Sequence, residues 1–217
     1  MSDLREVLRG LDVFAGELPD VDVGGLPSEP RELFVEWLLA AVRAGVREPH
    51  AMTLSTTGED GDPAARVLIL KDVSPDGWHF AADAGGRKGR ELAARPAAAL
   101  TFYWSPLARQ VRIRGRVRPG GPDEGAADFL ARSPGARAEA LLGRQSTPLD
   151  DLAVRDAAVR EAAARIEAEP GLVAPGWTRY ALHADTVEFW QGDRERRHTR
   201  VVYTRTAEGW ERGLLWP

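Results

Sequence analysis

The most regular hydrophobic pattern in the chain is a strict alternation over residues 110–118. Val111, Ile113 and Val117 fall on one side of an extended backbone, while a glutamine and four arginines fall on the other. This pattern predicts a strand with one buried face and one wet face. Shorter apolar runs, divided by polar or Gly/Pro turns, predict further strands at residues 52–56, 67–70, 78–81, 97–103, 179–190, 200–204 and 210–215.

Helices are predicted in fewer places. Pro30 suits a first helical turn, and apolar residues then recur at helical spacing as far as Gly45. The other predicted helices cover residues 122–132, 137–142 and 149–168. Many short strands with hairpin turns, together with a few peripheral helices, predict a mainly β fold (α+β). We expect an antiparallel barrel rather than a parallel doubly wound sheet.

The chain is expected to form one domain preceded by an arm. Residues 11–29 are rich in Asp, Gly and Pro and show little periodicity, so residues 1–29 are interpreted as a flexible N-terminal arm. Residues 30–217 are long enough for a single domain with a full hydrophobic core.

Composition narrows the class of ligand. A net charge of -4 argues against a general nucleic-acid binder, which needs basic surface over much of its area. The absence of cysteine excludes disulfides and thiolate metal sites, and the four histidines are too scattered in the sequence to predict a metal site. No apolar run approaches the roughly 20 residues of a membrane span. We therefore expect a soluble cytoplasmic protein that binds a small molecule, without nucleic-acid, membrane or metal partners.

A first group of cations lies near the end of the chain. In an extended backbone, Arg194, Arg196, His198 and Arg200 would share one face. Such a face is self-repelling unless an anion sits on it. The sequence therefore predicts an anion site here.

A second group of cations follows a pair of glycines. Gly85 and Gly86 allow close backbone approach, and Arg87 and Lys88 then enter a helix start, an arrangement that suits a phosphate. An ordinary turn leading into a solvated basic helix end is the alternative. Sequence motifs of nucleophile elbows, zinc proteases, phosphate loops and dinucleotide folds are absent.

Several motifs together resemble the pyridoxamine 5'-phosphate oxidase family from about Pro30 to Pro217. They are Arg66-Val67-Leu68-Ile69-Leu70-Lys71, Gly86-Arg87-Lys88, Arg109-Gln110-Val111, Gln145-Ser146, and Glu188-Phe189-Trp190-Gln191 followed by Arg196, His198 and Arg200. The helix start at Lys88 and the basic tail are also similar to the phenazine-pathway oxidases of this family. The resemblance implies an FMN-binding split antiparallel β-barrel and a homodimer with FMN at the subunit interface.

The resemblance also implies roles for individual residues. The cofactor contacts it implies are Arg66, Val67, Leu68, Ile69, Leu70, Lys71, Ala81, Ala82, Arg87, Lys88, Gln110, Gln145, Ser146, Trp190 and Arg200. The substrate-side positions are Lys71, Asp128, Arg132, Arg196, Arg197 and His198. Arg196 and His198 would be the catalytic pair, with His198 orienting the substrate or relaying a proton, because an unperturbed histidine titrates near pH 6.5.

The substrate side departs from the family pattern. Where the family grips a substrate phosphate with Lys, Tyr, Arg and Ser, this chain has Lys71, Asp128, Arg132 and Ala136. A carboxylate about 4 Å from a phosphate repels it by roughly 4 kcal/mol at an effective dielectric near 20. The alternative is that Asp128 turns aside and pairs with Arg132, one helical turn away. In the C-terminal motif, Arg197 stands where the family has an aliphatic residue and Thr199 where it has an acid or amide.

Three functions are compatible with these residues. The first is an FMN-dependent oxidase that converts pyridoxine or pyridoxamine 5'-phosphate to pyridoxal 5'-phosphate with O2 and releases H2O2. The second is an FMN-dependent oxidase of a ring-shaped secondary metabolite. The third is a non-catalytic protein that binds flavin or pyridoxal phosphate. A deazaflavin on the same barrel is the alternative cofactor.

Overall fold

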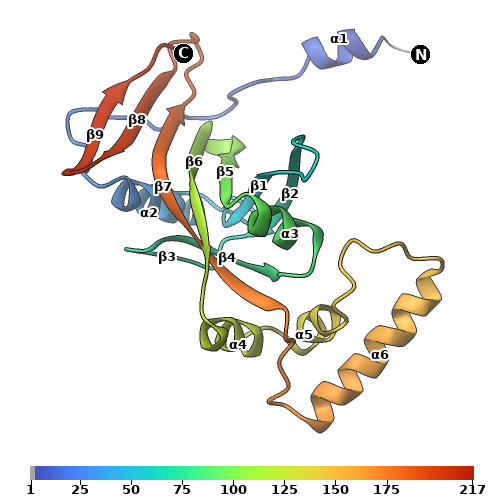
Figure 1. Cartoon of the computed structure of the whole chain (residues 1–217). Coiled ribbons are helices and arrows are strands. Elements are labelled where there is room, and N and C mark those ends of the chain that lie inside the picture. The colour runs from blue at the N-terminus through green and yellow to red at the C-terminus, as the bar shows by residue number, and fades with distance from the viewer. Residues whose placement is uncertain (1–2) are drawn as a thin grey trace. The chain divides into compact units, whose positions relative to one another are not determined.

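The computed structural model describes residues 3–217, which form two compact units. The first unit comprises residues up to Thr53, Leu100–Ile113 and Asp185–Pro217, and the second comprises Leu54–Ala99 and Arg114–Ala184. The helices of the described chain are α1 (Leu4–Arg9), α2 (Pro30–Arg43), α3 (Arg87–Ala94), α4 (Pro122–Leu130), α5 (Pro134–Leu141) and α6 (Leu152–Ala168), with a short 3₁₀ turn at Ser105–Leu107 (Figure 1).

Within residues 3–217, nine strands are joined in one sheet. They are β1 (Ala51–Thr57), β2 (Pro63–Ile69), β3 (Asp72–Ser74), β4 (Gly77–Asp83), β5 (Ala97–Trp104), β6 (Arg109–Pro119), β7 (Trp177–Gln191), β8 (Thr199–Thr206) and β9 (Gly209–Leu214). The order is β2-β1-β5-β6-β7-β4-β3, while β8 pairs with β7 and β9 pairs with β8. The pairs β3–β4, β4–β7, β7–β8 and β8–β9 are antiparallel. The prediction of a mainly antiparallel β fold with peripheral helices is confirmed.

In the first unit, helix α2 supplies much of the core. Its apolar residues recur at helical spacing, so Leu33, Phe34 and Trp37 are buried together on one face. The Phe34 ring meets Phe102 at 4.9 Å between centroids, and the Trp37 ring meets Phe189 at 5.2 Å, both edge to face. This aromatic core holds the ends of β5 and β7 in place.

The N-terminal segment contains a short helix that was not predicted. Helix α1 begins after Asp3, whose side chain accepts a hydrogen bond from the backbone N–H of Arg5, and none of its residues is buried. Further along, the backbone carbonyl of Pro27 accepts a hydrogen bond from the Tyr203 hydroxyl at 2.8 Å. This hydrogen bond attaches the C-terminal end of the segment to β8. The flexibility of residues 1–29 stays a prediction.

In the second unit, β3, β4 and the first half of β7 form an antiparallel ladder. Phe80 and Tyr180 stack across this ladder with ring centroids 5.4 Å apart. Gly77 has φ of 125°, and a Cβ there would lie 2.1 Å from the Leu182 carbonyl oxygen, so the tight start of β4 requires glycine.

The helices of the second unit differ slightly from those predicted. The pattern at residues 122–132 ends early, because Pro134 begins a separate helix, α5, capped by the Ser133 side chain. Helices α5 and α6 pack through Ala138, Ala162 and Ile166, with Val159 partly buried beside them, and most other residues of α6 are exposed (Figure 1). Among the described residues, none of the helices combines the length and apolarity needed to cross a membrane.

Candidate functional site

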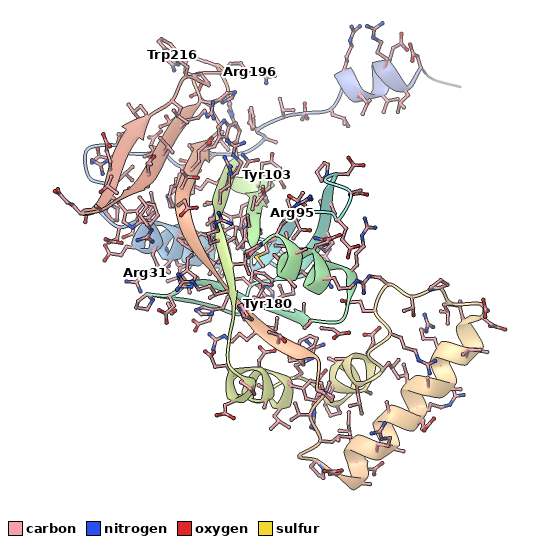
Figure 2. All side chains as sticks on the ribbon, viewed as in Figure 1. Arg31, Arg95, Tyr103, Tyr180, Arg196 and Trp216 are labelled. Carbon is pink, nitrogen blue, oxygen red and sulfur yellow. The ribbon has the colours of Figure 1, made fainter. Side chains whose placement is uncertain are left out.

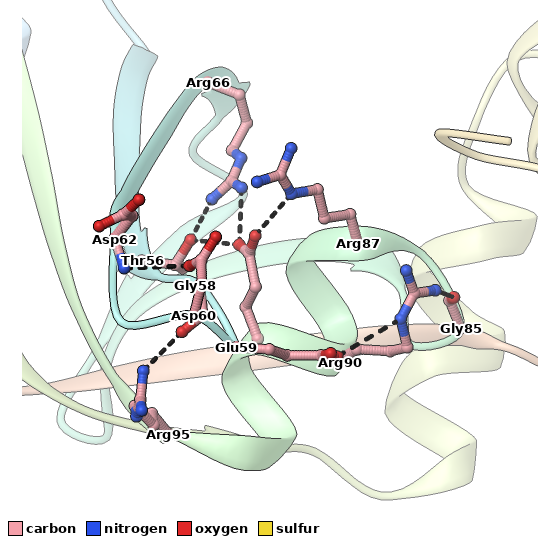
Figure 3. A network of polar contacts seen from close by, with 11 residues as sticks. Thr56, Gly58, Glu59, Asp60, Asp62, Arg66, Gly85, Arg87, Arg90 and Arg95 are labelled. Atoms are coloured by element: carbon pink, nitrogen blue, oxygen red, sulfur yellow. Dashed lines mark hydrogen bonds and ion pairs between the residues drawn. The ribbon is translucent and has the colours of Figure 1, made fainter. Parts of the chain in front are cut away.

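A buried carboxylate organises the first cluster of cations, in the second unit. Glu91 on α3 is 2% exposed and accepts hydrogen bonds from the Thr56 hydroxyl at 2.5 Å, Arg66 Nη2 at 2.7 Å and Arg87 Nε at 2.9 Å. Arg66 also donates to the Thr56 hydroxyl. Figure 3 shows Arg66 and Arg87 converging from β2 and α3. We call Thr56, Arg66, Arg87 and Glu91 the Glu91 cluster; it fixes two guanidinium groups that would otherwise be mobile.

The Glu91 cluster carries surplus positive charge. Burial alone would raise the pKa of Glu91, but the hydrogen bonds from Thr56 and Arg66 outweigh it, so the pKa lies below its ordinary value and the group is ionised. Lys88 is 7% exposed, and its pKa is lowered by burial and by the charge of Arg66. The Lys88 ammonium donates to the Gln145 side-chain oxygen. Asp83 also acts on the charge of Lys88, so three cations face two carboxylates here, and a surplus of one positive charge remains, as an anion site requires.

Glycines bring the start of α3 close to the preceding chain. A Cβ at Gly89 would lie 2.3 Å from the backbone oxygen of Ala84, and one at Gly86 would lie 2.9 Å from the Gln145 side-chain oxygen. Side chains at these positions would push the helix away from its support. Of the two glycines named from the sequence, Gly86 therefore makes a close approach, whereas a Cβ at Gly85 would make only an ordinary contact, 3.5 Å from the Asp83 side chain.

A cavity of about 740 Å³ adjoins these residues within the second unit. Its wall includes eight of the predicted cofactor contacts: Val67, Leu68, Ile69, Lys71, Ala81, Ala82, Lys88 and Gln145. Val67 is 67% exposed although it is apolar, whereas Leu70, which alternates with it along the chain, is buried. Ser146 follows in a loop with φ of 68°. The structure therefore gathers most of the predicted contacts of this unit around one volume.

A second cluster, also in this unit, surrounds Asp128. Its Oδ1 atom lies 3.3 Å from the Lys71 ammonium, and its Oδ2 atom accepts a hydrogen bond from Trp177 Nε1 at 2.8 Å. The Arg132 guanidinium lies over the Trp177 ring at 4.1 Å, and its Nη2 donates to the Ala136 carbonyl at 3.1 Å. We call Lys71, Asp128, Arg132 and Trp177 the Asp128 cluster. The ion pair of Asp128 is with Lys71, not with Arg132 as the local alternative supposed.

Packing fixes the Asp128 cluster. The Phe129 ring meets Trp177 edge to face at 6.2 Å, and a Cβ at Gly125 would lie 2.5 Å from the Trp177 carbonyl oxygen, so α4 is pressed against the start of β7. Burial lowers the pKa of Arg132, although the nearby charges of Asp128 and Glu139 oppose the shift. Lys71, Arg132 and Trp177 all line the 740 Å³ cavity.

The C-terminal cations lie in the first unit, and their predicted arrangement is wrong. Residues 192–198 form a loop, because the Asp193 carboxylate accepts hydrogen bonds from the backbone N–H groups of Glu195 and Arg197, and Arg196 has φ of 66°. An alternating face over Arg194, Arg196 and Arg200 therefore does not form. The side chains of Arg196 and Trp216 point outward from this unit (Figure 2).

His198 is nevertheless held in a defined position. Its Nδ1 atom accepts a hydrogen bond from the backbone N–H of Asp193 at 3.0 Å, so the neutral ring carries its proton on Nε2. The ring lies 5.0 Å from Trp190 and 5.6 Å from Phe14 of the N-terminal segment. The Arg196 guanidinium lies 5.8 Å from the same Phe14 ring. The two predicted catalytic residues and Trp190 are therefore neighbours.

Arg200 belongs to another buried-acid network of the first unit. Its Nε donates to Glu188 at 3.0 Å and its Nη1 to the Trp216 carbonyl at 2.7 Å, while Arg112 also donates to Glu188. Burial would raise the pKa of Glu188, but the two arginines lower it below the ordinary value. Arg197, by contrast, is exposed and pairs with Glu195 at 2.8 Å. Gln110 lies half-buried on β6.

Sequence reasoning missed four residues of these clusters: Thr56, Glu91, Trp177 and Phe14. Glu91 could have been found, because it lies four residues after Arg87 at helical pairing distance. Trp177 and Phe14 carried no such signal, since their partners lie 49 and more residues away in the chain.

Comparisons with known proteins bear on these clusters. Residues 38–166 match the family described as pyridoxamine 5'-phosphate oxidase, and residues 177–217 match the pyridoxine 5'-phosphate oxidase C-terminal dimerisation region. A pyridoxine/pyridoxamine 5'-phosphate oxidase of Burkholderia multivorans is 40% identical over 91% of this chain and 93% of its own. One from Thermosynechococcus vestitus is 43% identical over 87% of this chain and 89% of its own.

Solved structures show the same fold. PhzG from Burkholderia lata, in complex with tetrahydrophenazine-1-carboxylic acid, superimposes with a TM-score of 0.84 at 31% identity, covering 93% of this chain and 100% of that one. A pyridoxamine 5'-phosphate oxidase-related, FMN binding protein from Nostoc punctiforme superimposes with a TM-score of 0.69 at 19% identity, covering 89% and 99% of the two chains. The fold is that of the split antiparallel β-barrel.

Proposed function

Because this chain belongs to the pyridoxamine 5'-phosphate oxidase family, we propose that it is an FMN-dependent oxidase acting on a CH–OH or CH–NH2 group attached to a heteroaromatic ring. Pyridoxine and pyridoxamine, with or without a 5'-phosphate, are the first candidate substrates, since relatives 38–43% identical are named pyridoxine/pyridoxamine 5'-phosphate oxidase. The observation that carries the proposal is the cavity, where eight predicted cofactor contacts adjoin a cluster with surplus positive charge.

The residues of the second unit fit FMN. Arg66, Arg87 and Lys88 would hold its phosphate, because their charges exceed that of Glu91 and two of them are already oriented. The small side chains of Ala81 and Ala82, together with the apolar edge of β2, leave room for the ring system in a volume of ligand-pocket size. Bound there, FMN would take two electrons from the substrate carbon and pass them to O2.

The proposed oxidation needs no reactant beyond the substrate, O2 and, for an amine, water. An alcohol R–CH2OH and O2 give the aldehyde R–CHO and H2O2; an amine R–CH2NH2 also consumes water and releases ammonia. The residues of the chain need only place the substrate and manage protons. His198 would present Nε2 to the substrate, and Arg196 beside it would attract an electron-rich group.

A homodimer is part of this proposal. Residues 177–217 match the family's dimerisation region and include Trp190 and Arg200, two of the predicted cofactor contacts. The contacts predicted at Gln110, Gln145, Ser146, Trp190 and Arg200 stay predictions, to be tested by flavin binding in single variants.

An unphosphorylated ring-shaped metabolite is the second candidate substrate. It is favoured by the ion pair between Lys71 and Asp128, which places a carboxylate where a substrate phosphate would bind. The similarity to PhzG, whose structure holds a ring carboxylic acid, supports the same candidate.

Anaerobic reduction tests the proposed reaction. The FMN-loaded protein would be mixed with pyridoxine, pyridoxamine and their 5'-phosphates without O2, and the visible flavin absorption followed. Bleaching that reverses when O2 is admitted is the expected result. A protein that binds FMN and stays oxidised with all four compounds would overturn the proposal for these rings and favour the non-catalytic alternative or a different ring.

A further inference from the structure

We infer that Asp128 is a specificity-determining residue that turns the wall of the cavity from a phosphate site into a site for a neutral hydrogen-bond donor, such as a free hydroxymethyl group on the substrate ring. This inference rests on the proposed oxidase function. It concerns the substituent that lies against Lys71 and Asp128, not the carbon that is oxidised.

The charges at this wall are already largely matched. Lys71, 29% exposed at its side chain, is paired at 3.3 Å with Asp128, which is 12% exposed. The Arg132 guanidinium lies over the Trp177 ring and donates one Nη2 hydrogen to the Ala136 carbonyl. The carboxylates of Asp128 and Glu139 both act on Arg132, so a phosphate ester of charge near -2 would meet two cations whose charges are offset by two carboxylates.

Asp128 cannot easily turn away from such a ligand. One of its oxygens is bound by Lys71 and the other by the Trp177 indole N–H, and the Trp177 ring itself contacts Phe129 and Arg132. Moving the carboxylate would leave a half-buried indole donor without its partner.

The same carboxylate has room for a donor. Each carboxylate oxygen offers about two lone-pair directions, and each Asp128 oxygen has one partner here. A hydroxyl or amine group of a ligand in the cavity could donate to a remaining direction. This wall of the cavity therefore favours an alcohol group of a ligand and disfavours a phosphate group.

Steady-state kinetics of the FMN-loaded full chain would test the inference. We expect kcat/KM for pyridoxine to exceed that for pyridoxine 5'-phosphate by at least about tenfold. In Asp128→Asn, kcat/KM for pyridoxine 5'-phosphate should rise about 10- to 100-fold. The upper limit for removing a like charge about 4 Å from the phosphate is about three orders of magnitude in binding. The value for pyridoxine should stay equal or fall. Asp128→Tyr combined with Ala136→Ser should raise the phosphate value further.

Asp123→Asn is the matched control, since Asp123 is an exposed carboxylate on the same helix. It should leave both values unchanged. A wild-type protein that prefers the phosphate, or an Asp128→Asn variant with no gain for it, would overturn the inference.

Binding of inorganic phosphate separates this inference from the oxidase proposal. With FMN bound, calorimetric titration should show at least tenfold tighter phosphate binding to Asp128→Asn than to the wild type, even if neither protein is reduced by any substrate. Equal affinities would reject the role of Asp128. Failure of flavin reduction alone would reject only the proposed reaction.

Discussion

Two acids of the second unit, the buried Glu91 and the half-buried Asp128, lie among cations and differ in how far they offset the positive charge around them. Glu91 accepts from Thr56, Arg66 and Arg87 beside a third cation, so the cluster keeps surplus positive charge. Asp128 faces Lys71 and an uncharged indole, with a single further cation nearby. The comparison teaches that a basic residue marks an anion site only when its neighbours leave its charge uncompensated. Counting arginines and lysines in a sequence cannot establish this.

Removing Glu91 should give the largest effect. In Glu91→Ala, two guanidinium groups lose a partner that is 2% exposed, which should lower the free energy of unfolding by about 2–4 kcal/mol and weaken FMN binding at least tenfold. Urea unfolding and flavin fluorescence titration would measure both quantities.

Glu59→Gln provides the control for this prediction. Its carboxylate is 71% exposed and lies 3.9 Å from Arg90, so the loss should be below about 0.5 kcal/mol. Equal losses in the two variants would show that Glu91 does not organise the cluster.

Removing the indole N–H at the second acid should have a smaller effect. Trp177→Phe keeps an aromatic ring but takes one hydrogen bond from Asp128, which should cost about 1 kcal/mol of unfolding free energy. FMN binding should change little, because the three cations proposed to hold the FMN phosphate, Arg66, Arg87 and Lys88, do not belong to this cluster. A flavin affinity that falls together with the stability would show that the two clusters are not independent.

The smallest effect is a pH dependence. Because the folded-state pKa of Glu91 is lowered, its contribution to stability is complete above the ordinary carboxyl value and is lost as the pH falls through the lowered pKa. Unfolding midpoints of the wild type and Glu91→Gln should therefore differ at pH 7 and converge in acid. A gap that stays constant down to pH 3 would contradict the assigned ionisation.

The strands and the glycine-to-helix start could be predicted from the sequence because both depend on local patterns. The alternation at 110–118 appears as β6, and Arg87 and Lys88 begin α3 as expected. The loop at 192–198 could not be predicted, since the Asp193 side chain binds the following backbone and overrides the alternation. The ion-pair partner of Asp128 was missed for another reason: Lys71 lies 57 residues away, so the family resemblance placed the two residues at one site, but local spacing favoured Arg132 as the partner.

Gly89 has a mechanical consequence. A Cβ at this position would lie only 2.3 Å from the Ala84 carbonyl oxygen, so the absence of a side chain lets helix α3 pack directly against the residue that follows β4. Lys88 and Glu91 lie on either side of Gly89 in the same short helix, so any shift of α3 against Ala84 would move the Lys88 ammonium and the Glu91 carboxylate together. A larger residue at position 89 would therefore displace both groups at once. It would disturb the Glu91 cluster and Lys88 together rather than weaken one contact.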